Sequence, residues 1–253
     1  MRRPSLCLVL AALVLSALSG CYFTRSPTRP VAAMEMRREA RVRQDCLVVM
    51  LPGFLDGPDT YREHGFGNEL LGSGAACDAV AVDLHYRYYG EMGLGEVVYE
   101  DVLAPATARG YDEIWLVGIS MGGLGALLAA NRHPELVDGI ILLSPFVGDA
   151  SVVAQVRDAG GLAEWTPPEH TGEWTESDYT LRLWTWLRGY VTDPDGMPPL
   201  WIGWGEGEDL EGPDSVLAAA LPEGHVFHIP GRHAWSTWRP LFREVLASAR
   251  PGR

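Results

Sequence analysis

The chain has 253 residues, of which 47% are hydrophobic, so it is long enough to bury one sizeable core and a single domain is expected. Its formal net charge is −13 at pH 7. So acidic a chain disfavours nucleic acid as a partner, because the phosphate backbone would repel it.

Residues 1–20 predict an export signal. Arg2 and Arg3 form a positive segment, and the apolar run Leu6 to Leu18 that follows is too short to span a bilayer comfortably. The run ends in Leu18-Ser19-Gly20-Cys21, which resembles the lipobox of bacterial lipoproteins, whose cysteine is lipidated and becomes the mature N-terminus. The predicted location is therefore a bacterial membrane, with the lipid-anchored protein facing the periplasm or cell exterior. An ordinary secretory signal cut nearby is the alternative.

Residues 21–45 are interpreted as a lipid-anchored tether, since they carry two prolines and many polar side chains. Residues 21–44 hold six arginines against Glu35 and Glu39, a net charge of +4. Loss of the two signal arginines takes the chain from −13 to −15, so residues 45–253 carry −19. A basic tether suits an anionic lipid surface, although solvation of a mobile tether explains the arginines equally well.

From residue 46 onward, short apolar runs alternate with amphipathic segments. Strands are predicted at 47–51, 79–83, 114–117, 139–143, 199–203 and 226–229, and helices at 61–71, 96–109, 124–131, 215–221 and 234–249. The aromatic- and glycine-rich stretch 85–95 is predicted to be a loop. This alternation implies a mostly parallel open sheet with helices on both faces, in one α/β domain over residues 46–253.

The stretch Gly118-Ile119-Ser120-Met121-Gly122 lies between a predicted strand and a predicted helix. In that context Gly-x-Ser-x-Gly is a sharp turn that lifts a serine oxygen above the sheet. The two glycines lie close across the turn, where a Cβ would crowd it. Ser120 is therefore the predicted nucleophile, and the N–H of Met121 is expected to face a developing oxyanion. A glycine-rich turn with a buried serine is the alternative.

Residues 147–198 form the longest gap between predicted strands. A helix from Ser177 to about Arg188 would be apolar on two sides, so one side would cover the core and the other a substrate pocket. The region is interpreted as a lid insertion, with a stabilising insertion that touches no ligand as the alternative. It is rich in tryptophan: Trp165, Trp174, Trp184 and Trp186.

A serine nucleophile needs a base that a third group holds in place. His233 follows the last predicted strand and precedes the last helix, which places it at the sheet edge where ligands bind in open α/β sheets. His228 lies inside a strand and is interpreted as structural. His233 is therefore the predicted base.

The acid should follow a strand between the serine and the histidine, in the order Ser…Asp…His. Asp209 is favoured, because it ends a short glycine-bearing loop after the strand at 199–203. Glu208 and Asp149 remain open as alternatives. Asp214 is also open, although a capping role at a helix start would explain it without catalysis.

With these motifs in place, the chain from about residue 46 to 249 resembles the α/β-hydrolase family of serine esterases and lipases. The resemblance rests on the turn at Ser120, the loop Leu51-Pro52-Gly53-Phe54, the acid loop after Trp204 and the stretch Gly231-x-His233-x-Trp235. Pro52 stands where many members have histidine. An extra glutamate makes the alignment of Asp209 ambiguous by one residue, and the N-terminal strands of the full fold are weak or absent.

The resemblance implies cleavage of a carboxylic ester or related acyl bond through an acyl-enzyme, with Ser120, Asp209 and His233 as the triad. The N–H groups of Phe54 and Met121 would bind the oxyanion. Neither a metal nor an organic cofactor is implied. The expected substrate is a small acyl ester, apolar or aryl from the tryptophans, and the acidic domain disfavours an anionic one. An acyltransferase with the same triad and a non-catalytic binding lipoprotein are the alternatives.

Apart from Cys7 and Cys21, the sequence contains two cysteines, and the resemblance predicts how they pair. Cys46 and Cys77 each precede one of two successive strands that are neighbours in this fold. Export would place them in an oxidising compartment. A disulfide between them is therefore expected at the end of the sheet opposite the active site, with two buried free thiols as the alternative.

Overall fold

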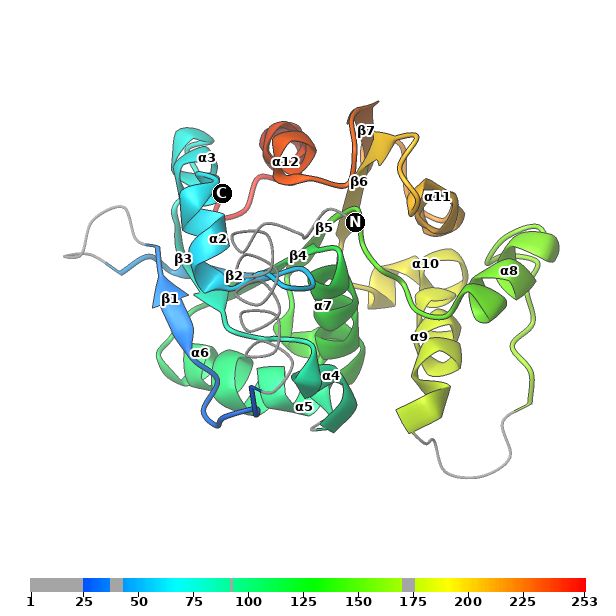
Figure 1. The fold of residues 1–253 in the computed structure, drawn as a ribbon, viewed down its shortest axis with the longest axis horizontal. Coiled ribbons are helices and arrows are strands. Elements are labelled where there is room, and N and C mark those ends of the chain that lie inside the picture. Colours follow the sequence, from blue (N-terminus) through cyan, green and yellow to red (C-terminus); the bar gives the residue numbers. More distant parts are fainter. Residues whose placement is uncertain (1–24, 37–42, 92, 170–175) are drawn as a thin grey trace, which may run out of the picture.

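The computed structural model describes residues 25–36, 43–91, 93–169 and 176–253 (Figure 1). The signal at 1–20, the proposed lipidation at Cys21 and Trp174 lie outside the described residues. The described chain forms a seven-stranded sheet in the order β1-β3-β2-β4-β5-β6-β7, with helices on both faces. The predicted α/β class with a mostly parallel open sheet is confirmed. No helix in the described ranges is both long enough and apolar enough to cross a membrane.

The strands occupy the central layer of the molecule. They are β1 (Ala33–Glu35), β2 (Cys46–Leu51), β3 (Cys77–Val82), β4 (Glu113–Ile119), β5 (Gly139–Leu143), β6 (Leu200–Glu206) and β7 (Val226–Pro230). Strands β2 and β5 are buried at every position, as parallel strands covered on both faces must be. Neighbouring strands from β3 to β7 are parallel, so their carboxyl ends meet at one edge of the sheet.

The helices form the two outer layers. They are α2 (Pro58–Glu63), α3 (Phe66–Gly72), α4 (Arg87–Glu91), α5 (Leu94–Val98), α6 (Ala104–Ala108), α7 (Met121–Arg132), α8 (Ala150–Asp158), α9 (Tyr179–Leu187), α10 (Gly189–Thr192), α11 (Glu211–Ala218) and α12 (Trp235–Ala249). One core cluster lies between the sheet and α2, α3 and α12, and the larger one lies under α5–α9 and α11. Both faces of the sheet are therefore covered by packed apolar side chains.

Two helix predictions and one loop prediction need correction. The predicted helix 61–71 is two helices, because Gly65 adopts a positive φ of 75° and ends the first. The predicted helix 96–109 contains a π turn at Tyr99–Leu103, just before Pro105. Proline has no N–H and crowds the carbonyl four residues earlier, so the regular ladder cannot run through it. The predicted loop 85–95 contains the short helix α4.

Part of the predicted tether packs onto the domain. Strand β1 pairs antiparallel with β3, and Val31 beside it is buried. Arg29 forms ion pairs with Asp101 and Glu100 on the π turn, at 2.5 and 2.6 Å. With only three residues, β1 offers too short a polarity pattern for a strand prediction. The described residues from Arg29 to Glu35 therefore pack on the folded domain, although the sequence prediction assigns them to the tether.

Cys46 and Cys77 form a disulfide, with their Cα atoms 4.5 Å apart. They are register partners at the amino ends of β2 and β3. This is the pairing expected from the resemblance, and it lies at the edge of the sheet opposite the carboxyl ends of the strands. The bridge ties β3 to β2 across a sequence separation of 31 residues.

We expect the double variant Cys46→Ser, Cys77→Ser to lose about 3–4 kcal/mol of unfolding free energy, because an open chain of this loop length gains conformational entropy when unfolded. Denaturant unfolding of the exported protein measures the loss. Alkylation of unfolded, unreduced protein followed by mass spectrometry provides the control. Alkylated Cys46 and Cys77 peptides in the wild type would contradict the bridge.

Candidate active site

Ser120 lies on the turn between β4 and α7 with a φ of 52°, a value that non-glycine residues rarely adopt. Such a backbone costs about 1–3 kcal/mol and persists only where its surroundings hold it. Here the Ser120 N–H donates to the carbonyl of Leu143 at 3.0 Å, and the Ser120 carbonyl accepts from the N–H of Phe146 at 2.8 Å. Strand β5 and the loop after it therefore hold the turn in its strained form.

The two glycines of the motif are sterically required. A Cβ on Gly118 would lie 2.3 Å from the carbonyl oxygen of Gly122. A Cβ on Gly122 would lie 2.0 Å from the carbonyl oxygen of Leu51, at the end of β2. The first contact is the one the sequence predicts across the turn. The second shows that the start of α7 presses directly against the neighbouring strand.

His233 reaches the serine from the loop between β7 and α12. Its Nε2 lies 2.9 Å from Ser120 Oγ. The ring stands edge-on to Trp238, with ring centroids 4.9 Å apart, and the Trp238 indole N–H donates to the buried Ser144 hydroxyl. Sequence position alone predicted this histidine, and the structure brings it to the predicted serine. His228 lies on β7 and contacts Glu206, away from this pair.

Glu208 faces the other ring nitrogen of His233. Its Oε2 lies 3.5 Å from His233 Nδ1, and its side chain is only 1% exposed. This separation is longer than a hydrogen bond, so the contact is chiefly electrostatic. Neither carboxylate oxygen has a hydrogen-bond partner among the described residues. The carboxylate is thus buried and directed at the base without a competing donor in the described chain.

The contact with His233 that the sequence prediction assigned to Asp209 belongs in the structure to Glu208. Asp209 is exposed in the turn between β6 and α11. Gly207, with a φ of 81°, redirects the backbone there, so that the Glu208 side chain points inward and the Asp209 side chain outward. The longer glutamate side chain then spans the remaining distance. The structure therefore places Glu208 beside His233, in the position that the sequence prediction gave to Asp209.

The other two acid candidates lie elsewhere. Asp149 is the N-cap residue of α8 and exchanges hydrogen bonds with Thr180 on α9. Asp214 is no helix cap, because α11 begins at Glu211. It is fully buried, and its carboxyl oxygens have no partner among the described residues. Burial raises the pKa of Asp214 well above its usual range, and the charge of Glu208 raises it further, so the protonated form is favoured.

The loop after β2 runs beside the nucleophile. A Cβ on Gly53 would lie 3.5 Å from Ser120 Cβ, so the backbone that leads into Phe54 passes next to the serine. The Phe54 side chain is 45% exposed and meets Tyr86 edge-on. Met121 is the first residue of α7, where an N–H has no partner within the helix. Both predicted oxyanion residues thus lie beside Ser120.

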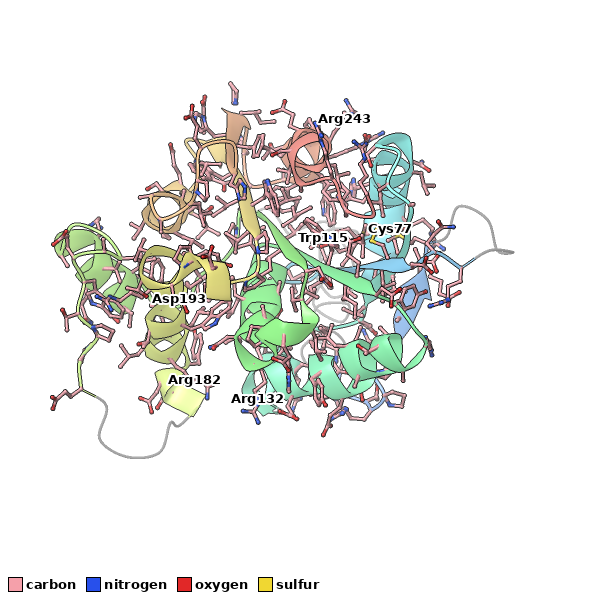
Figure 2. The ribbon with its side chains drawn as sticks, turned by 180° about the vertical axis from the view of Figure 1, so that it is seen from behind. Cys77, Trp115, Arg132, Arg182, Asp193 and Arg243 are labelled. Atoms are coloured by element: carbon pink, nitrogen blue, oxygen red, sulfur yellow. A yellow bond between two sulfur atoms is a disulfide. The ribbon has the colours of Figure 1, made fainter. Side chains whose placement is uncertain are left out.

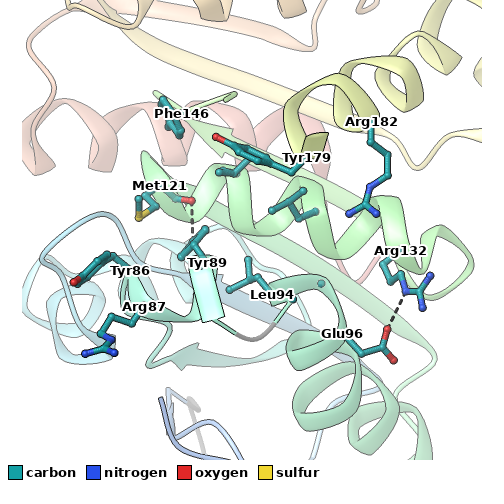
Figure 3. A pocket seen from close by; sticks show the side chains of 15 residues that line it. Tyr86, Arg87, Tyr89, Leu94, Glu96, Met121, Arg132, Phe146, Tyr179 and Arg182 are labelled. Atoms are coloured by element: carbon teal, nitrogen blue, oxygen red, sulfur yellow. Dashed lines mark hydrogen bonds and ion pairs between the residues drawn. The ribbon is translucent and has the colours of Figure 1, made fainter. Parts of the chain in front are cut away.

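A pocket of about 970 Å³ lies along α7 and begins at Met121, next to the nucleophile (Figure 3). Its aromatic wall consists of Tyr86, Tyr89, Phe146 and Tyr179. The Tyr89 hydroxyl donates to the carbonyl of Met121 at 2.9 Å, which ties this wall to the nucleophile turn. The aromatic stretch at 85–95 is the sequence signal for Tyr86 and Tyr89, and the prediction of a loop there assigns them no role.

The insertion at 147–198 contributes to the pocket differently from the prediction. Trp165 and Trp184 are buried in the larger core, and Trp186 packs against it. The pocket wall contains no tryptophan among the described residues, whereas α9 contributes Tyr179 and Arg182. The described tryptophans of the insertion therefore pack in or against the core and do not line the pocket. Within the same described ranges, no His, Cys, Asp or Glu cluster is arranged to bind a metal ion.

Comparison with known proteins agrees with this geometry. Residues 47–172 match the sequence model of a family described as alpha/beta hydrolase fold. Among curated proteins, no sequence matches significantly. Est1E from Butyrivibrio proteoclasticus is similar in structure, with 16% identity and a TM-score of 0.58 over 87% of this chain and 93% of that chain.

Two further solved structures are similar over most of their length. The S-formylglutathione hydrolase of Staphylococcus aureus has 16% identity and a TM-score of 0.55, over 81% of this chain and 80% of that chain. A monoacylglycerol lipase of Paleococcus ferrophilus has 15% identity and a TM-score of 0.54, over 86% of this chain and 98% of that chain. With the sheet order and the turn at Ser120, these matches identify the fold of this chain as that of the α/β-hydrolases.

We expect Glu208→Gln to lower kcat for ester hydrolysis by at least a hundredfold, because a neutral amide can hold the wrong imidazole tautomer, an effect of about 10⁴ in a comparable triad. Asp209→Asn should stay within tenfold, since Asp209 is exposed. Asp214→Asn should also stay within tenfold, because the amide, like the neutral carboxyl favoured at Asp214, places no second negative charge beside Glu208. Thermal unfolding checks that each variant folds. Full activity in Glu208→Gln with a large loss in Asp209→Asn would return the acid role to Asp209.

Proposed function

We propose that this protein is a serine hydrolase that cleaves a carboxylic ester through Ser120, His233 and Glu208. The observation that carries the proposal is the 2.9 Å contact between His233 Nε2 and Ser120 Oγ at a strained strand-to-helix turn. The buried Glu208 carboxylate on the other side of the ring supports it. Similar structures whose names include a ferulic acid esterase and an arylesterase also favour ester hydrolysis.

In this mechanism Ser120 Oγ attacks the acyl carbon while His233 Nε2 takes its proton. Glu208 stabilises the resulting imidazolium. The N–H groups of Phe54 and Met121 bind the oxyanion, and each such donor is worth roughly 2.7–4 kcal/mol. The imidazolium then gives the proton to the leaving alcohol, which departs and leaves an acyl-enzyme. A water molecule, deprotonated by His233, attacks the acyl-enzyme and releases the acid.

The exposure of the base favours hydrolysis over transfer to another acceptor. The His233 side chain is 34% exposed, so water can reach the position from which it attacks the acyl-enzyme. The aromatic pocket wall suits a small-molecule ester with an apolar or aryl part. One similar structure is described as ferulic acid bound to Est1E. Ferulic acid is an aryl acid, bound there to a protein of the same fold. No cofactor takes part in the proposed steps.

Ser120→Ala tests the nucleophile. We expect a fluorophosphonate probe to label the wild type and Ser151→Ala, a variant of an exposed serine on α8, but not Ser120→Ala. Hydrolysis of a p-nitrophenyl ester panel should fall by up to about 10⁶ in kcat, as in a comparable triad. Folding should be retained. Activity of Ser120→Ala within tenfold of the wild type would exclude the mechanism.

We also propose that the mature protein is lipidated at Cys21, exported and held on a bacterial membrane. The apolar segment ending in Leu18-Ser19-Gly20-Cys21 supports this proposal. One acyl chain anchors only marginally, so stable attachment needs further chains or help from the arginines of 21–44. Cys21→Ser should move the protein from the membrane fraction to the soluble fraction. An unchanged fractionation would contradict lipid anchoring at this cysteine.

A further inference from the structure

The pocket beside Ser120 has a charge opposite in sign to that of the whole chain. The sequence contains 33 acidic residues against 20 basic ones. The pocket wall, in contrast, includes Arg87, Arg132 and Arg182 with Glu96 as its one acidic residue in the described chain. A surplus of cations in an acidic protein points to a ligand that carries negative charge.

Two of these arginines converge from different helices at one end of the pocket. Arg132 is the last residue of α7, and Arg182 lies on α9, which packs against α7. Figures 2 and 3, drawn from different directions, both place the two side chains next to each other. Among the described residues of the pocket wall, Glu96 is the one carboxylate that accompanies them.

The contacts of the pair leave positive charge uncompensated. Arg132 Nε donates to Glu96 Oε2 at 2.9 Å, and within the described residues this is the contact that orients its guanidinium group. Arg182 makes no hydrogen bond or ion pair within the described part of the chain. Two adjacent guanidinium groups with one carboxylate form a site that a further carboxylate would complete, since the planar fork of arginine pairs with that group through two parallel bonds.

The pair lies far from the nucleophile along the same pocket. Met121 and Arg132 are the two ends of α7, eleven residues apart, which corresponds to about 16 Å along the helix axis. Leu124 and Leu128 line the pocket between them on the same helix face. The pocket thus has one end at Met121, next to the nucleophile, an apolar and aromatic middle, and a cationic far end.

We propose that the protein selects esters that carry a carboxylate at the end remote from the scissile bond, held by Arg182 and Arg132 with an apolar or aryl segment along α7. This inference rests on the proposed ester hydrolysis at Ser120. It reverses the sequence-based expectation that the acidic domain disfavours an anionic substrate, because the local charge of the pocket, and not the net charge of the chain, faces the ligand.

The kinetic test compares p-nitrophenyl hemi-esters of linear dicarboxylic acids with p-nitrophenyl esters of monocarboxylic acids of equal length. Over a series of lengths, kcat/KM should favour the charged ester by about three- to tenfold at the longer lengths, a modest factor because exposed ion pairs are weak. Salt should reduce the preference. Esters with the carboxylate on the leaving group form a second arm and show which side of the ester lies along α7.

Variants assign the preference to the two arginines. Arg182→Gln and Arg132→Gln should each reduce the ratio of charged to neutral ester, and the double variant should bring it near one. Arg157→Gln is the matched control, because Arg157 is an exposed arginine on α8 that does not line the pocket. An unchanged ratio in the double variant, or no preference in the wild type at any length in either arm, would overturn the inference while ester hydrolysis stands.

Binding separates the inference from the proposed function. Calorimetric titration of the Ser120→Ala protein with the mono-amide of a linear dicarboxylic acid requires no catalysis. Binding that is weakened at least threefold by Arg182→Gln would support the anionic site even if no ester were cleaved. Absence of binding, or binding unaffected by the arginine variants, would overturn the site whatever the esterase assays show.

Discussion

The close approach of α7 to β2 is the constraint on which the rest of the site depends. Because a Cβ on Gly122 would collide with the carbonyl of Leu51, the first turn of α7 can pack against β2 only with glycine at this position, directly after the turn at Ser120. The turn is held by hydrogen bonds to Leu143 and Phe146. One packing requirement therefore sets the position of the nucleophile, the direction of α7 and the beginning of the pocket along it.

The acid side of the site is governed by burial. Glu208 and Asp214 are both enclosed beside α11, and their carboxyl oxygens lack hydrogen-bond partners among the described residues. Burial raises the pKa of Asp214 well above its usual range, and the nearby Glu208 carboxylate raises it further, so the neutral carboxyl is favoured. A neutral Asp214 places no second negative charge beside Glu208, whose carboxylate faces His233.

The insertion between β5 and β6 links the core to the pocket. Trp184 donates its indole N–H to the carbonyl of Val147 and is fully buried, so α9 is held firmly on the domain. The opposite side of the same helix presents Tyr179 and Arg182 to the pocket. A helix anchored by one face and lining a cavity with the other positions its cation without relying on a flexible loop.

The sequence by itself determined the α/β class, the strands of the parallel sheet, Ser120 and His233, because buried parallel strands are continuous apolar runs and the sharp turn requires glycines at a fixed spacing. Only the tertiary structure decided that Glu208 and not Asp209 faces the base, since side-chain direction in the turn depends on the dihedral angles around Gly207. It also decided the pairing of β1 with β3, because a strand of three residues is too short to show a polarity pattern. Finally, it decided that Arg132 and Arg182 lie next to each other, because residues fifty positions apart become neighbours only when α9 packs on α7.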